Sequence, residues 1–174
     1  PKVWHKKCHI CIHEDTLLYV LNQLTAVLEY RKGRLAETGC PNLDAYNEAT
    51  GENLPRLVFA CDEVAEVVDK TGRSKEDKDL LAQIENRLAT LARLGRAFGI
   101  HLILATQRPD ANILPGQIKI NLDFRVCGRA DDILSGIILG NNSADDQIPK
   151  DARGRFITGD GTVFQAYLFD EGRL

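Results

Sequence analysis

The stretch LVFACDE, residues 57–63, decides the fold class of this chain. Its apolar residues run without interruption into two adjacent carboxylates, Asp62 and Glu63. A continuous apolar run of this length predicts a strand that is covered on both faces in a parallel sheet. Because ligands bind outside the carboxyl ends of such strands, Asp62 and Glu63 are candidate site residues.

Adjacent carboxylates at the end of a buried strand suit the chemistry of magnesium and nucleotides. In this interpretation Asp62 holds the hydration shell of a Mg²⁺ ion, and Glu63 polarises an attacking water. The alternative is that both carboxylates begin a loop or cap the following helix, since carboxylates are common after strands. The short stretch by itself leaves both interpretations open.

A second apolar stretch, IHLILAT at residues 100–106, predicts a neighbouring strand. A helix separates the two stretches, and a strand, a helix and a strand in succession make a crossover unit with parallel strands. The carboxyl ends of the strands therefore meet at one edge of the sheet, which brings Thr106 and Gln107 beside Asp62. There both residues are placed to sense a terminal phosphate by hydrogen bonding.

Helical periodicity predicts two long helices. The first runs over residues 15–36, with Asp15 as its N-cap and leucines at helical spacing. The second follows Ser74 and Asp77, which form a variant of the capping box, and stops at Gly99. The shorter predicted elements are a helical turn at 43–47, a strand at 124–128, a helix at 130–139, and a strand pair at 154–158 and 162–169 joined by GDGT.

Composition limits the function classes without selecting one. The 174 residues are 44% hydrophobic and carry a net charge of -3, so the chain can bury a core but has no overall basic field for a polyanion. No apolar run approaches the roughly 18 residues that span a bilayer. We expect an intracellular protein with no membrane contact from this segment. Because the chain begins at Pro1 and has no Met, we also expect it to be part of a longer protein.

Three segments together resemble a known family. LVFACDE is preceded by GCPNLDAYN, and a helix and then GIHLILATQRPDANILPGQIKINLDFRVCGR follow it. This combination resembles the motor domain of the FtsK/SpoIIIE family of DNA-translocating ATPases over most of the chain. The resemblance implies an α/β, RecA-like P-loop NTPase fold, a mostly parallel sheet flanked by helices and incomplete at its N-terminus. It also implies that residues 1–174 are the C-terminal portion of one motor domain, which uses ATP and Mg²⁺ and forms a hexameric ring around double-stranded DNA.

The resemblance also implies roles for individual residues. Asp62 and Glu63 resemble the family's Walker B pair, and Gln107 takes the sensor-like place. Arg96, in LGRAFGIH, resembles the position thought to reach a neighbouring subunit's nucleotide as an arginine finger. The alternative for Arg96 is a cation that satisfies a helix C-terminus.

Three other arginines are weaker candidates for such a role. Arg108 precedes a proline and is placed to bond backbone carbonyls, whereas Arg125 and Arg129 flank the predicted strand at 124–128. All three therefore rank below Arg96 as candidates.

The phosphate-binding loop of this family is missing from the chain. The pattern G-x-x-x-x-G-K-[ST] does not occur, and no Gly is followed by Lys. Without the backbone N–H groups and the Lys of that loop, the site lacks its main anion binder. We therefore predict that this chain alone hydrolyses no ATP. The loop is expected upstream in a longer protein, and the alternative is a decayed remnant.

The stretch PDANILPGQIKINLD, residues 109–123, is the candidate contact with DNA, because loops at this level line the channel of the ring that the resemblance implies. Lys119 and Gln117 are candidate phosphate contacts, with Asn112 and Asn121 as neutral donors. A single Lys is simply solvated in most proteins. Six copies in a ring, however, would make a band of charge.

The N-terminal stretch HKKCHICIHED has two interpretations. Cys8 and Cys11 have the spacing of zinc ligands, with His5, His9 and His13 nearby, but no second ligand pair follows at the spacing of a zinc finger. The alternation of side chains favours a strand. Whether Cys8 and Cys11 bind a metal stays open.

Several functions remain in competition. The leading one is a double-stranded DNA translocase, and the ending GRFITGDGTVFQAYLFDEG is similar to motor domains of coupling ATPases in conjugative elements, which favours DNA transfer over chromosome segregation. The alternatives are an ATPase module of type VII protein secretion and a non-catalytic ring or interaction domain. In the leading interpretation the motor is cytoplasmic, and the parent protein is tethered to the inner face of the bacterial cell membrane.

Overall fold

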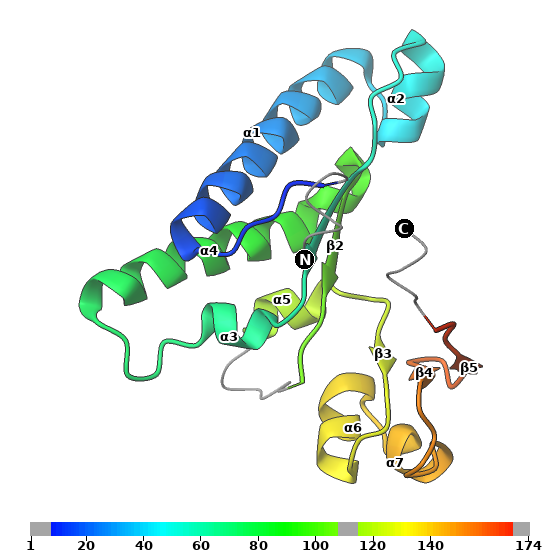
Figure 1. Cartoon of the computed structure of the whole chain (residues 1–174). Helices are drawn as coiled ribbons and strands as arrows, with labels where there is room; N and C mark the ends of the chain where they lie inside the picture. The colour runs from blue at the N-terminus through cyan, green and yellow to red at the C-terminus, as the bar shows by residue number, and fades with distance from the viewer. Residues whose placement is uncertain (1–7, 108–114, 169–174) are drawn as a thin grey trace. The chain divides into compact units, whose positions relative to one another are not determined.

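The computed structural model describes residues 8–107 and 115–168 (Figure 1). Contacts divide the chain into two compact units, which we name the sheet–helix unit and the C-terminal unit. The sheet–helix unit consists of Cys11–Arg108 and Asn112–Asn121, and the C-terminal unit consists of Pro1–Ile10, Pro109–Ala111 and Leu122–Leu174. The assignment of all 174 residues to one motor domain stays a prediction.

The sheet–helix unit is built on a parallel pair of strands, as predicted. Strands β1 (Leu57–Cys61) and β2 (Ile100–Leu104) pair in register, from Leu57 opposite Ile100 to Cys61 opposite Leu104. One face of this pair is exposed, with Val58 and Ile103 at 63% and 58% exposure. The prediction of a strand covered on both faces is therefore wrong for the described residues, because they supply packing to only one face.

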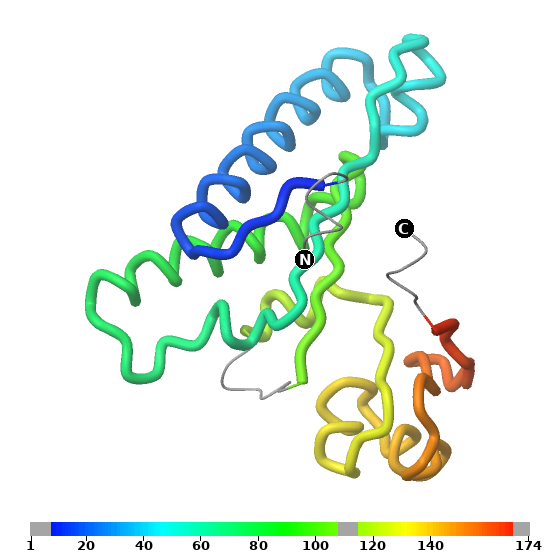
Figure 2. The backbone as a smooth tube through the Cα atoms, in the orientation of Figure 1, coloured from blue at the N-terminus to red at the C-terminus, as the bar shows by residue number. Residues whose placement is uncertain are grey.

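Two long helices form most of the core of this unit. Helix α1 (Glu14–Thr38) lies beside α4 (Lys75–Leu94), and Figure 2 shows the two helices as neighbouring coils. Their leucines and isoleucine at helical spacing are almost fully buried: Leu21, Leu28, Leu35, Leu81, Ile84, Leu88 and Leu91. Packing of amphipathic faces, more than helix propensity, holds such helices in place.

The helix ends match the sequence in part. Ser74 caps α4 by accepting a hydrogen bond from the backbone N of Asp77 at 3.1 Å, as the capping box predicts. The prediction of Asp15 as N-cap of α1 is wrong, since His13 occupies that position and Asp15 lies in the first turn. There the carboxylate still faces the positive end of the helix dipole. Gly99, at φ 69°, ends the 3₁₀ helix η2 (Gly95–Phe98) that follows α4.

Three short helices complete this unit. The predicted turn at 43–47 is longer in the structure, where α2 extends over Leu43–Thr50. Helix α3 (Val64–Val68) follows Glu63 directly. Part of the stretch predicted as a channel loop is also helical: α5 (Gly116–Ile120), whose Ile118 is fully buried. Burial of this one apolar side chain explains why the segment folds back onto the unit.

A buried arginine joins α1 to the amino ends of both strands. Arg31 is only 3% exposed, and its guanidinium donates to the carbonyl oxygens of Phe98 at 2.6 Å and Pro55 at 2.7 Å. Phe98 lies just before β2 and Pro55 just before β1. Burial lowers the pKa of Arg31 from its ordinary value, and the two carbonyl oxygens compensate for the lost hydration.

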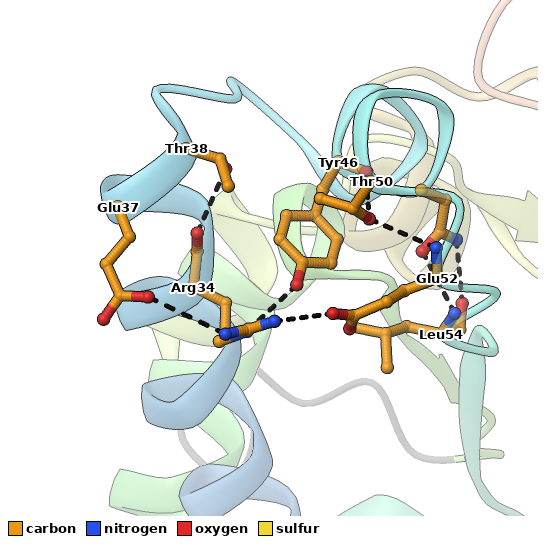
Figure 3. A network of polar contacts seen from close by, with 8 residues as sticks. Arg34, Glu37, Thr38, Tyr46, Thr50, Glu52 and Leu54 are labelled. Atoms are coloured by element: carbon orange, nitrogen blue, oxygen red, sulfur yellow. Dashed lines mark hydrogen bonds and ion pairs between the residues drawn. The ribbon is translucent and has the colours of Figure 1, made fainter.

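A second polar network fixes α2 against α1 (Figure 3). Arg34 donates to the hydroxyl of the fully buried Tyr46 at 2.9 Å and pairs with Glu52 at 2.6 Å. The amide of Asn47 exchanges two hydrogen bonds with the backbone of Leu54, both at 3.0 Å. These contacts order the connection that leads from α2 into β1.

The C-terminal unit contains an antiparallel sheet and two helices. Strands β3 (Val126–Cys127), β4 (Arg155–Thr158) and β5 (Val163–Gln165) pair in the order β3-β4-β5. The predicted strands and their GDGT connection are confirmed, but β3 pairs with β4 and not with the parallel strands. Helices α6 (Asp132–Leu139) and α7 (Ser143–Gln147) complete the unit. Its core is made of Cys127, Ala144, Ile148 and Ile157.

The arginines that flank β3 have structural partners. Arg125 donates to the carbonyl oxygens of Leu122 at 3.0 Å and Ile138 at 3.3 Å. Arg129 pairs with the carboxylate of Asp145 at 2.5 Å and also donates to backbone carbonyls at the end of α7. Arg108, the third weaker candidate, lies outside the described residues.

The N-terminal stretch differs from its prediction. Cys8 to Ile12 form no strand, because no other described segment pairs with their backbone. Within the described ranges, no group of three or more His, Cys, Asp or Glu side chains could hold a metal ion. The helices in those ranges are also too short or too polar for any of them to cross a membrane.

Candidate functional site

The carboxyl ends of β1 and β2 are locked together by backbone hydrogen bonds. Ala105, the first residue after β2, donates its N–H to the carbonyl of Cys61 at 2.8 Å. Val64, the first residue of α3, donates in turn to the carbonyl of Ala105 at 2.9 Å. Asp62 and Glu63 lie between these two bonds, so the backbone that carries both carboxylates is fixed to the neighbouring strand.

The side chain of Glu63 binds the end of the neighbouring strand. One carboxylate oxygen, Oε1, accepts from the hydroxyl of Thr106, and the other, Oε2, accepts from the backbone N of Gln107 at 2.9 Å. Glu63 occupies the N-cap position of α3 but makes no side-chain bond to that helix. Glu63 is therefore the N-cap residue of α3 by position, while its side chain binds the end of β2. Its carboxylate is half-buried and positioned by two donors.

Asp62 differs from its neighbour in environment. Asp62 is exposed, whereas Glu63 is half-buried. An exposed carboxylate beside a positioned one fits a hydrated Mg²⁺ ion, which keeps several waters and takes few protein ligands.

A thiol also lies at this edge of the sheet. Burial raises the pKa of Cys61 above its ordinary value of 9.0, so this thiol stays protonated near neutral pH. A protonated thiol is a poor nucleophile and a poor metal ligand. The Cys61 thiol is therefore a weaker candidate for a functional group than the carboxylates of Asp62 and Glu63.

Thr106 and Gln107 lie where the parallel strands were expected to bring them. The hydroxyl of Thr106 and the backbone N–H of Gln107 both donate hydrogen bonds to the carboxylate of Glu63. The Gln107 residue is exposed, which leaves its side-chain amide accessible from solvent. The sequence did not reveal that these residues bind Glu63 directly.

Arg96 lies at the opposite end of β2 from this group. It belongs to η2, which precedes β2, whereas Thr106 and Gln107 follow that strand. A strand of five residues is about 16 Å long at the usual rise per residue, so Arg96 does not join Glu63 in the same chain.

Arg96 lines a hollow that sequence reasoning missed. Its other polar residues include Arg56, Arg93 and His101, and Arg56 is held by both carboxylate oxygens of Asp44 at 2.7 Å. The Nε2 atom of His101 is buried, with no hydrogen-bond partner in the part of the chain that the structure describes. The residues that join Arg96 here come from separate elements, which explains why no sequence motif shows the group.

The candidate DNA residues lie on or next to α5. Gln117 and Lys119 belong to this helix, and Asn121 follows it as C-cap. The side-chain amide of Asn121 donates to the carbonyl of Gln117 at 2.7 Å. Gln117 and Asn121 line a groove beside α4, and Lys119 is half-buried. Asn112 lies outside the described residues.

Comparisons with known proteins place the chain among motor ATPases. No family model matches it. It is 36% identical over 110 residues to the DNA translocase FtsK of Campylobacter jejuni, a match that covers 61% of this chain and 11% of the relative. The chain therefore spans only a small part of the length of this relative.

Solved structures agree with this placement. The pCW3 conjugation coupling protein TcpA, in its monomer form with ATPgS, superposes with a TM-score of 0.93 at 37% identity, covering 99% of this chain and 50% of TcpA. The cytoplasmic domain of the type VII secretion ATPase EccC from Thermomonospora curvata superposes with a TM-score of 0.59 at 23% identity, covering 83% of this chain and 16% of EccC. The likeness to EccC concerns the fold alone.

Proposed function

We propose that the protein to which this chain belongs is an ATP-driven translocase of double-stranded DNA. The reason is that the chain is part of an FtsK/SpoIIIE-type motor domain with the fold of P-loop ATPases. One observation carries this proposal: Glu63, two residues after the end of β1, is held by Thr106 and Gln107 at the end of β2. The likeness to a conjugation coupling protein over nearly the whole chain favours DNA transfer as the process. We place the motor in the cytoplasm.

The residues at the carboxyl ends of β1 and β2 have different roles in the proposed reaction. ATP would supply the phosphoryl group, and Mg²⁺ would supply the positive charge that holds it. Asp62 would be the carboxylate that binds the hydrated ion. Glu63 accepts a proton from, or orients, the attacking water. Thr106 and Gln107 fix the direction of the Glu63 carboxylate, so a change at either residue alters the position of the base.

Arg96 serves a different copy of the chain in this proposal. It lies at the other end of β2 from Glu63, so in this proposal it would act on a nucleotide held by a neighbouring subunit. A guanidinium delivered in this way stabilises the charge that develops during phosphoryl transfer. The proposal therefore requires a ring, and a hexamer matches the family resemblance.

The chain supplies only part of the nucleotide site. Its 174 residues contain no G-x-x-x-x-G-K-[ST] sequence, so the phosphate cradle has to come from another part of the protein. We accordingly propose that the chain alone turns over no ATP. DNA contact is assigned to Lys119, Gln117 and Asn121 around α5.

The test uses the longer protein that includes a phosphate-binding loop. Magnesium-dependent ATP turnover is measured with and without double-stranded DNA, for the natural sequence, for Glu63→Gln and for Glu66→Gln. Glu66 is an exposed carboxylate on the first turn of α3, so its variant is a matched control. DNA should stimulate turnover, and Glu63→Gln should reduce it by about 100-fold or more, the usual contribution of a general base.

Other outcomes point to the competing functions. Turnover that ignores DNA would favour the type VII secretion ATPase, whose solved relative shares the fold. Turnover that survives Glu63→Gln would remove the assigned base. Absence of turnover in the longer protein, with or without DNA, would favour a non-catalytic ring or interaction domain.

A further inference from the structure

A groove runs between α4 and α5 in the sheet–helix unit. Helix α5 packs against α4, and Figure 1 shows the short helix beside the long one. The lining residues come from these two helices and the cap of α5: Asn86, Arg87, Ala89, Thr90, Arg93, Gln117, Ile120 and Asn121.

The lining of this groove is cationic, although the chain as a whole is acidic. The chain has 25 Asp and Glu residues and a net charge of -3, yet among the residues that the structure describes no carboxylate lines the groove. Two guanidinium groups do, on Arg87 and Arg93, accompanied by amides and one hydroxyl. A groove of this composition attracts anions locally, even though the net charge of the chain does not.

Both arginines are available for a ligand in the geometry observed. Arg87 donates through Nε to the side-chain oxygen of Asn22 at 2.7 Å, which positions its terminal nitrogens without neutralising them. Arg93 is exposed in the last turn of α4. Among residues 8–107 and 115–168, no carboxylate forms an ion pair with either arginine.

Some of the neutral groups already have partners in the helices. The hydroxyl of Thr90 donates to the carbonyl of Asn86 at 2.9 Å, and the amide of Asn121 donates to the carbonyl of Gln117. The donors that remain for a ligand are the two guanidinium groups and the side-chain amides of Asn86 and Gln117. These groups suit phosphate oxygens, which accept hydrogen bonds from guanidinium and amide donors.

We propose that this groove binds the sugar–phosphate backbone of DNA, with Arg87 and Arg93 as phosphate contacts. Arg93 follows Arg87 by six positions, which is about 9 Å along a helix axis and comparable with two to three nucleotide steps of about 3.4 Å on one strand. This inference rests on the function proposed above. It extends the DNA surface from α5 onto α4, which neither the sequence motifs nor the comparisons indicated.

The test measures duplex binding by the 174-residue chain. Fluorescence anisotropy with a labelled mixed-sequence duplex is recorded over a range of NaCl concentrations for the natural chain and for the double variant Arg87→Gln, Arg93→Gln. The matched control, Lys75→Gln with Lys78→Gln, removes the same charge from exposed positions in the first turn of the same helix. The control separates local contacts from the effect of net charge.

Loss of two phosphate contacts has a defined signature. The double variant should bind about 10-fold or more weakly, and the slope of log affinity against log salt should fall by about 2. The control should stay within about 2-fold, because long-range attraction alone is screened by salt. If Arg87→Gln disturbs folding, Arg93→Gln alone should lower the slope by about 1.

Further measurements distinguish a failure of this inference from a failure of the proposed function. If Lys119→Gln weakens duplex binding while the groove variants leave affinity and slope unchanged, the groove inference is wrong and the DNA surface on α5 stands. If the natural chain binds no duplex even at low salt, both are wrong. If polyglutamate displaces the labelled duplex as well as unlabelled duplex does, the groove binds acidic polypeptide instead of DNA.

Discussion

At the scale of single residues, two adjacent carboxylates have different environments. Glu63 is held by a hydroxyl and a backbone N–H, whereas Asp62 next to it is exposed. The proposed roles, Asp62 toward a hydrated ion and Glu63 toward the attacking water, rest on this difference in environment.

The hydrogen bond from Thr106 to Glu63 should have a measurable effect on stability. Thr106→Val keeps the side-chain shape but removes the donor, and the half-buried carboxylate loses a partner. We expect the free energy of unfolding to fall by about 2 kcal/mol, as measured by urea denaturation. Thr38→Val is the control, because the Thr38 hydroxyl bonds only to its own helix. Equal stability of the two variants would contradict the role assigned to Thr106.

The buried guanidinium of Arg31 should matter more. Arg31→Met leaves the carbonyl oxygens of Phe98 and Pro55 without their donor. A loss of about 3 kcal/mol in the free energy of unfolding is expected, since buried acceptors without partners are costly. Lys32→Met removes a neighbouring exposed charge and should change stability by less than about 0.5 kcal/mol. A small effect at Arg31 would show that water replaces the guanidinium.

At the scale of elements, side-chain contacts decide how short segments dock. Helix α2 is fixed to α1 through Arg34, Tyr46 and Glu52, and the strand pair β1 and β2 is held at its amino ends by Arg31. In the C-terminal unit, the turn between β4 and β5 depends on Asp160. Its carboxylate accepts from the hydroxyl of Thr158 and from the backbone N of Thr162 at 3.1 Å.

This turn should weaken in acid. The hydrogen bond from Thr158, followed by those from Thr162, lowers the pKa of Asp160 below its ordinary value of 3.8. A carboxyl group with a lowered pKa in the folded state stabilises the fold above the unfolded pKa and loses this effect as pH falls through the folded pKa. The Thr162 amide should therefore exchange with solvent faster as pH drops below about 4, after correction for intrinsic exchange.

The control for this prediction is a pair of substitutions. Asp160→Asn should remove the acid-dependent step in exchange at Thr162, while Asp151→Asn, at an exposed position outside the turn, should leave it unchanged. A step that persists in Asp160→Asn would assign the titration to another group.

At the scale of the whole molecule, the proposed reaction needs more than one copy of the chain. Glu63 and Arg96 lie at opposite ends of β2, so in the proposed reaction one subunit would supply the base and another the arginine. The two units of the chain are each compact, and the site described here belongs entirely to the sheet–helix unit.

Mixing inactive variants tests this arrangement. In the longer protein, Arg96→Ala and Glu63→Gln should each reduce ATP turnover by about 100-fold or more. A mixed ring, however, contains interfaces that combine an intact Glu63 with an intact Arg96. Turnover should therefore reappear on mixing, up to about a quarter of the natural rate when subunits assemble at random and interfaces act independently. Mixtures that stay inactive under conditions where subunits exchange would contradict a role for Arg96 across the interface.

Much of the sheet–helix unit could be predicted from the sequence. Apolar runs of strand length, a capping box and leucines at helical spacing are local signals, and they located β1, β2, α1 and α4. The failures have a common cause. The strand expected at Cys8 to Ile12 and the loop expected at Gly116 to Ile120 both depended on partners that are distant in sequence, and local alternation or polarity does not report those partners.

The sequence by itself determined the parallel strand pair and the position of Asp62 and Glu63 at its end, because hydrophobic periodicity and strand length are properties of neighbouring residues. Only the tertiary structure decided that Thr106 and Gln107 bind Glu63, that Arg31 is buried between two carbonyls, and that Arg87 and Arg93 share a groove with α5. Glu63 and Thr106 are 43 positions apart, and no local pattern encodes a contact at that separation. Such contacts form only once packing of the helices and pairing of the strands have brought the segments together.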